Sequence, residues 1–148
     1  MKKSERMKPV AKVTESREKM AAKALGESNR ELQQHEQRLS ELENYRNEYL
    51  GYCQERGSDG ISAAKFQELQ RFLLNLNKAV EQQQQLVEFT QQSLAMKKSS
   101  WQEARSRTRA MDTVIDRYRR QEQQSEQKRE QKEQDEIGSR QGNSKITP

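Results

Sequence analysis

The strongest pattern in the chain is a repeat of apolar positions in steps of three and four residues, which runs from Phe66 to Tyr118. Twelve of its sixteen positions are apolar, in a chain whose overall apolar content is 30%. This alternation is typical of the a and d positions of a coiled coil, where each helix buries one narrow seam against a partner helix. The positions are Phe66, Leu69, Leu73, Leu76, Val80, Gln83, Val87, Thr90, Leu94, Lys97, Trp101, Ala104, Thr108, Met111, Ile115 and Tyr118.

A second repeat of the same kind lies upstream and covers residues 25–53. A shorter run before it, from residue 10 to residue 24, has the same steps but is one residue out of phase. We therefore expect a local slip of the coiled coil near residues 21–25. The second repeat comprises Leu25, Ser28, Leu32, His35, Leu39, Leu42, Arg46, Tyr49 and Cys53, and the shorter run comprises Val10, Val13, Arg17, Met20 and Ala24.

The segment Gly57-Ser58-Asp59-Gly60 separates the two repeats and consists of turn-forming residues. Gly57 is suited to end the first helix in the left-handed conformation, and Ser62 is suited to cap the start of the second helix. A short connection between two long helices makes them antiparallel neighbours. The sequence therefore predicts a helical hairpin.

The register of the hairpin follows from matching the two repeats. When facing residue numbers sum to about 118 to 119, apolar positions meet apolar positions. The same register pairs the polar positions, His35 with Gln83 and Ser28 with Thr90. Beyond the expected slip, Arg17 would face Trp101 in a cation–π contact.

The predicted fold class is all-α: a long antiparallel two-helix coiled-coil hairpin with an overhanging second helix and a disordered C-terminal tail. Residues 1–8 are expected to be a flexible basic segment, 9–130 the hairpin with its turn at 57–61, and 131–148 the tail. Because residue 9 would face about residue 109, the apolar stripe beyond it is expected to be exposed. That stripe comprises Met111, Val114, Ile115 and Tyr118.

Composition and charge restrict the function. With 34% charged residues, 148 residues cannot fill a globular core, and one cysteine fits a reducing cytosol. Residues 1–30 and 97–120 each carry a net charge of +5, so the hairpin end that bears both segments is strongly basic, whereas residues 31–96 carry −4 and residues 121–148 carry −1. A basic end can attract an acidic protein cavity, a nucleic acid or an anionic lipid, or it can be a solvated charged face.

One edge of the predicted hairpin is apolar. With a at Leu39 and Val80, the g positions of both helices lie side by side in an antiparallel pair, whereas the opposite edge is polar. The aromatic and aliphatic side chains on this apolar edge either widen the hairpin seam or form a docking stripe for a protein partner. The g positions are Arg38, Tyr45, Tyr52, Phe72, Ala79 and Leu86.

These residues carry a resemblance to a known family. The run Tyr45-Arg46-Asn47-Glu48-Tyr49 and the turn Gly60-Ile61-Ser62, followed by Phe66, Phe72, Leu76, the run Ala79-Val80-Glu81-Gln82-Gln83 and Trp101, resemble the flagellar FliJ proteins. The similarity covers roughly residues 10–120. It implies a small cytosolic component of the flagellar type III export apparatus, peripherally associated with the cytoplasmic face of the cell membrane and similar to the stalk of an F-type ATPase.

The resemblance also implies partners and a site. The partners are the hexameric export ATPase FliI, the membrane export gate protein FlhA and export chaperones. The gate-binding residues, carried over by position, are Leu42, Tyr45, Tyr49, Phe72, Leu76 and Ala79; Arg38 and Gln83 lie on the same stripe and are not included. The residues expected to contact the ATPase ring are Arg17, Lys19, Arg105, Arg107, Arg109, Met111, Ile115 and Tyr118.

Other function classes have weaker support. His35 and Cys53 are the sole histidine and cysteine and cannot form a metal cluster or a catalytic dyad, so we expect no catalytic residue, metal or cofactor. A nucleic-acid-binding protein is the less favoured alternative, because acidic residues interrupt the basic segments. A generic scaffold or chaperone-binding coiled coil is the other alternative, in which the apolar edge joins two hairpins into a four-helix bundle.

Overall fold

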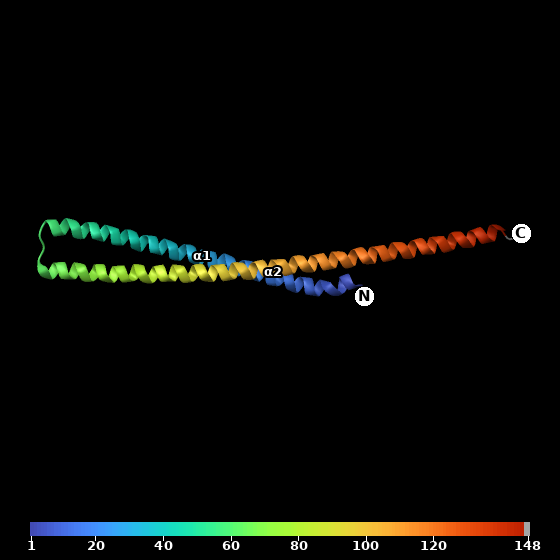
Figure 1. Ribbon diagram of the computed structural model, residues 1–148, viewed down its shortest axis with the longest axis horizontal. Helices are drawn as coiled ribbons and strands as arrows, with labels where there is room; N and C mark the ends of the chain where they lie inside the picture. Colours follow the sequence, from blue (N-terminus) through green and yellow to red (C-terminus); the bar gives the residue numbers. More distant parts are fainter. Residues whose placement is uncertain (147–148) are drawn as a thin grey trace. The chain divides into compact units, whose positions relative to one another are not determined.

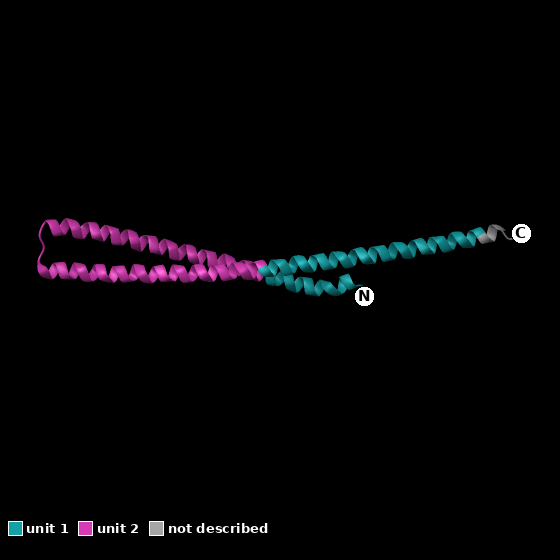
Figure 2. Ribbon diagram, viewed as in Figure 1, with its two compact units in different colours: residues 1–19, 103–148 teal, residues 20–102 magenta. Residues whose placement is uncertain are grey.

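A computed structural model describes residues 1–146, with side chains through residue 142. The described chain forms two helices and no strand: α1 spans Lys3–Ser58 and α2 spans Ala63–Ile146 (Figure 1). The residues cluster into two units (Figure 2): unit 1 contains residues 1–19 and the segment from 103 onward, and unit 2 contains residues 20–102. The predicted all-α class and its two long helices are confirmed.

The connection between α1 and α2 is made by residues 59–62. Gly60 has a φ of 79°, a left-handed conformation that glycine adopts without steric cost. The Ser62 hydroxyl accepts a hydrogen bond from the backbone N–H of Lys65 at 3.2 Å, which confirms its predicted capping role. Gly57, by contrast, lies inside α1, so the left-handed position comes three residues later than predicted.

In unit 2 the two helices run antiparallel with the predicted register. The Gln83 side-chain amide donates a hydrogen bond to the carbonyl of His35 at 3.0 Å, and the Tyr49 hydroxyl donates to the carbonyl of Leu69 at 3.4 Å. The residue numbers of both pairs sum to 118. The buried residues follow the predicted seam and include Ser28, Leu32, Leu69, Leu76, Val80, Gln83, Val87 and Thr90.

One seam position of unit 2 differs from the prediction. Phe66 is 51% exposed, although its periodicity places it in the seam. It lies four residues after the cap residue, in the first turn of α2, where α1 has nearly ended. A side chain at the last layer of a coiled coil has a neighbour on one side and water on the other.

The change of phase predicted within α1 near residues 21–25 is wrong. The less exposed positions of α1 keep one unbroken phase, with Met7, Ala11, Thr14, Glu18 and Ala21 leading into Leu25. Val10, Val13 and Met20, the apolar residues on which the slip was based, are 43%, 48% and 69% exposed. Ala11, Thr14 and Ala21 are among the residues in the seam here, and the larger apolar residues Val10, Val13 and Met20 lie beside it.

In unit 1 the paired region extends further than predicted. The Ser4 hydroxyl and backbone N–H donate to the two carboxylate oxygens of Glu122 at 2.7 and 3.1 Å. The ammonium of Lys2 lies 3.0 Å from the carboxylate of Glu126. Residues 1–8 are therefore not a free segment, because α1 begins at Lys3 and Ser4 is buried.

The expected exposure of the apolar stripe in unit 1 is also wrong. Ile115 is buried, with 7% of its surface exposed, and Met111, Val114 and Tyr118 are half-buried. The extra turns at the start of α1 cover them, and the ammonium of Lys3 lies 5.6 Å from the Tyr118 ring centroid. The Thr108 hydroxyl donates to the carbonyl of Thr14 at 3.3 Å, a pair whose numbers sum to 122. Facing pairs in unit 1 thus lie several residues further along α2 than a sum of 118 predicts.

At its C-terminal end, α2 is longer than predicted. The helix reaches Ile146, whereas the sequence places the end of the hairpin near residue 130 and a tail beyond it. Side chains of residues 123–142 are all exposed, and beyond Glu126, which pairs with Lys2, this stretch is an overhang of α2 within unit 1. Glutamine, glutamate, lysine and arginine dominate it, and these residues favour a helix without tertiary packing. The last two residues of the predicted tail, 147–148, lie outside the described residues.

Candidate functional site

A cluster of aromatic rings lies on one edge of unit 2, and we call it the aromatic edge: Tyr45, Tyr49 and Tyr52 of α1 and Phe72 of α2. The Phe72 ring lies 4.6 Å from the Tyr49 ring and 6.2 Å from the Tyr45 ring, the latter at an interplanar angle of 80°. Such tilted and edge-to-face pairs place the positive edge of one ring against the negative face of another. The heptad phase brings these residues together because Tyr45 and Phe72 are both g positions.

The exposure of the six predicted gate-binding residues falls into three levels. Leu76 is only 7% exposed, so its side chain belongs to the seam. Leu42, Tyr49 and Ala79 are half-buried, and Tyr45 and Phe72 are 49% and 40% exposed. Tyr45 and Phe72 therefore offer the largest accessible ring surface of the predicted site.

The Tyr49 hydroxyl fixes the base of the cluster. It donates to the carbonyl of Leu69 on the opposite helix. Burial raises the pKa of the Tyr49 phenol above its ordinary value of 10.0, with a smaller contribution from the neighbouring Cys53 thiol. Removing the phenol from water disfavours its anion, so Tyr49 stays a neutral donor and holds the rings in place.

Arg38 and Gln83, which the sequence left outside the site, have different positions. Arg38 lines a shallow surface hollow together with Leu42 and Tyr45, next to the aromatic edge. Gln83 is only 7% exposed, and its side-chain amide donates a hydrogen bond to the carbonyl of His35. Gln83 therefore acts within the hairpin, whereas Arg38 borders the surface.

Tyr52 and the adjoining Arg56 carry the aromatic edge towards the turn. The Tyr52 ring stacks on Tyr49 at 6.2 Å, and the guanidinium of Arg56 lies 5.2 Å from the Tyr52 ring centroid. The sequence placed Tyr52 on the g edge but did not include either residue in the site. The spacing of seven residues from Tyr45 to Tyr52 was the available signal.

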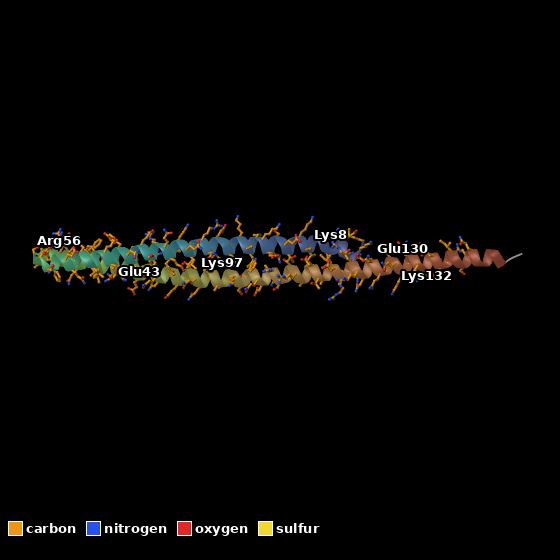
Figure 3. All side chains as sticks on the ribbon, turned by 90° about the horizontal axis from the view of Figure 1, so that it is seen from above. Lys8, Glu43, Arg56, Lys97, Glu130 and Lys132 are labelled. Carbon is orange, nitrogen blue, oxygen red and sulfur yellow. The ribbon has the colours of Figure 1, made fainter. Side chains whose placement is uncertain are left out.

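The residues predicted to contact an ATPase ring all belong to unit 1, and the structure divides them into two groups. The side chains of Arg17, Lys19, Arg105, Arg107 and Arg109 are exposed. Ile115 is buried, and Met111 and Tyr118 are half-buried against α1. Figure 3 shows side chains extending outward along both helices, with Lys8 labelled in this unit. The basic residues are thus accessible, and the apolar ones serve the packing of the two helices.

Within residues 1–146, no group of three or more histidine, cysteine, aspartate or glutamate residues is arranged to hold a metal ion. Neither helix, over its described length, contains an apolar stretch long enough to cross a membrane.

The fold and the aromatic edge define a helical coiled-coil protein with an exposed aromatic surface. The family model for the flagellar FliJ protein matches residues 2–146, and the chain belongs to this family. The chain is 39% identical over 99 residues to the flagellar FliJ protein of Salmonella typhi and 34% identical over 97 residues to that of Escherichia coli K12. Each alignment covers 66% of this chain and 66% of the relative, so about two thirds of the length of these relatives is matched.

Proposed function

We propose that this protein is a non-enzymatic component of the flagellar type III export apparatus that couples the export ATPase FliI to the export gate protein FlhA and assists export of flagellar proteins. In this proposal it acts in the cytoplasm and reaches the membrane through its protein partners, with export chaperones among them. Membership of the flagellar FliJ family supports the flagellar setting. The observation that carries the gate contact is the contact between two exposed rings, Tyr45 and Phe72, on one edge of the hairpin.

The aromatic edge suits a protein partner for energetic reasons. Aromatic side chains are enriched among the residues that dominate binding energy, and they lose little conformational entropy on docking. The contacts of Phe72 with Tyr45 and Tyr49 already restrict the rings before binding. A pre-organised surface of this kind reduces the entropic cost of association.

The exposed basic residues of unit 1 are the proposed contact with the ATPase ring. Arg105 and Arg109 are four residues apart and share one face of α2, whereas Arg107 lies on the opposite side, so the positive charge is presented in two directions. Such a distribution suits separate weak contacts on more than one side of the helix, as a surrounding ring would offer. The apolar residues Met111, Ile115 and Tyr118 are not part of this proposed contact surface, because they pack against α1.

The test of the gate contact is a binding measurement between this protein and the cytoplasmic domain of FlhA. The double variant Tyr45→Ala/Phe72→Ala is expected to weaken binding by about 30-fold or more, as for two residues at the centre of an interface. Leu74→Ala is the matched control, because Leu74 is 55% exposed on α2 but lies on the b position, away from the aromatic edge. Equal affinity of the double variant and the control would refute the gate contact.

Two further measurements keep this test specific. Circular dichroism of the double variant must retain the helical signal, since a loss of helix would assign the rings to the core rather than to a docking surface. Stimulation of ATP hydrolysis by FliI should survive in Tyr45→Ala/Phe72→Ala and should fall in the triple variant Arg105→Glu/Arg107→Glu/Arg109→Glu. Loss of stimulation in the aromatic variant alone would contradict the proposed division of the two contacts.

A further inference from the structure

A second exposed apolar surface lies on α2 of unit 2, towards the C-terminal side of the aromatic edge. Leu86, Phe89 and Met96 are 39%, 69% and 72% exposed. Their spacing of three and seven residues places them on one side of the helix. Phe89 is 17 residues from Phe72, which corresponds to about 25 Å along a helix. This surface is therefore separate from the aromatic edge.

Two residues of α1 complete the surface. The contact between Tyr45 and Phe72 shows that the g positions of the two helices share one edge, with numbers summing to 117. Along the same heptads, Ala24 of α1 is placed beside Ser93 of α2, and both are half-buried. Met20, which is 69% exposed, occupies the outer c position next to Ala24, as Phe89 and Met96 do on α2. We call this set the upper patch: Met20, Ala24, Leu86, Phe89, Ser93 and Met96.

Leaving such side chains in water is costly. Burial of phenylalanine and methionine side chains is favourable, and the upper patch presents one Phe and two Met that are each about 70% exposed. Its centre holds the small residues Ala24 and Ser93, which would let another pair of helices approach closely. Its shape and chemistry are those of one face of a four-helix bundle.

The charges around the upper patch of one copy are complementary to those of a second copy turned in the opposite direction. Glu27 and Glu31 lie on α1 at the Leu86 end, whereas Lys23 lies towards the Met96 end. A two-fold axis through the middle of the patch and perpendicular to the helices reverses the direction of the second copy. Lys23 of one copy then lies opposite Glu27 of the other, and each contact occurs twice, as in any isologous interface.

We propose that two copies of this chain associate antiparallel through the upper patch and form a four-helix contact. Phe89 of each copy would pack near Met96 of the other, with Ala24 and Ser93 at the centre. The ion pairs at the rim would select the antiparallel arrangement, since a parallel arrangement would place acid against acid.

The first experiment is analytical ultracentrifugation of the full chain over a concentration series up to about 100 µM, a range that detects micromolar association. The wild-type chain is expected to dimerise, and Phe89→Glu/Met96→Glu is expected to weaken dimerisation at least tenfold. Both side chains are exposed, so the helical signal should not change. Leu74→Glu, on the other side of α2, is the matched control and should dimerise like the wild type. A wild-type chain that stays monomeric, or a dimer that Phe89→Glu/Met96→Glu leaves intact, would overturn the proposal.

A charge exchange tests the antiparallel geometry. Glu27→Lys and Lys23→Glu each place like charges opposite one another in a homodimer, so each variant alone should dimerise more weakly than the wild type. An equimolar mixture of the two variants should restore dimerisation, because the heterodimer recovers both pairs of opposite charge. A mixture no stronger than the separate variants would rule out this arrangement.

Discussion

Ile115 provides the clearest test of how unit 1 is packed. Ile115 is only 7% exposed, and together with Ala11 and Lys8 of α1 it lines a surface hollow. Ile115→Ala removes three carbon groups at about 0.8 kcal/mol each, which gives about 2.4 kcal/mol. A residual cavity would add to this value, but two helices can partly close it, so we expect a loss of about 2–3 kcal/mol of stability, at the low end of measured Ile→Ala costs.

Ile137→Ala is the matched control, because it makes the same chemical change on the same helix at a side chain that is 55% exposed. Its expected effect lies within about 0.5 kcal/mol, as for most surface substitutions. Hydrogen exchange of the backbone amides of residues 7–19 measures the stability of unit 1 directly. Protection there should fall in Ile115→Ala and stay unchanged in Ile137→Ala. If the two variants behave alike, the first turns of α1 do not cover Ile115.

Two further predictions concern polar groups in the seam. Ser28 is 1% exposed, and among the described residues its buried hydroxyl has no hydrogen-bond partner. Ser28→Ala should therefore raise the free energy of unfolding by about 0.5–1.5 kcal/mol, because it removes an unsatisfied polar group and favours the helix. Urea unfolding measures this change. The hydrogen bonds from Ser4 lower the pKa of the Glu122 carboxyl below its ordinary value of 4.5. The stabilisation from these hydrogen bonds is thus present above pH 4.5 and is lost as the pH falls through the lower, folded-state pKa of Glu122. Hydrogen-exchange protection at the start of α1 should fall over the same pH range in the wild type but not in Glu122→Gln.

The candidate site was predictable from the sequence as a set of positions but not as a set of exposures. The heptad phase placed Tyr45 and Phe72 on one edge, and the structure brings their rings together. Leu76 shares the predicted site but is buried, and Tyr49 bonds across the seam. Periodicity gives the direction of a side chain from the helix axis, whereas its exposure depends on how closely the other helix approaches.

The register beyond unit 2 was a harder problem. Matching apolar residues gave the pairs of unit 2 correctly, because Leu69, Leu76 and Val80 are large and their layers are distinct. In residues 1–19 the sequence offered two stripes, one with Val10 and Val13 and one with Ala11 and Thr14. Hydrophobicity favoured the first stripe, and the folded protein buries the second more deeply.

The sequence by itself determined the two helices, the turn between them and the seam of α2, because helix propensity, capping and heptad spacing act over a few residues. The tertiary structure decided which stripe of α1 faces α2 in unit 1 and how far the pairing extends. That choice depends on contacts between residues far apart in the sequence, since the bonds from Ser4 to Glu122 and the burial of Ile115 hold this stripe of α1 against α2.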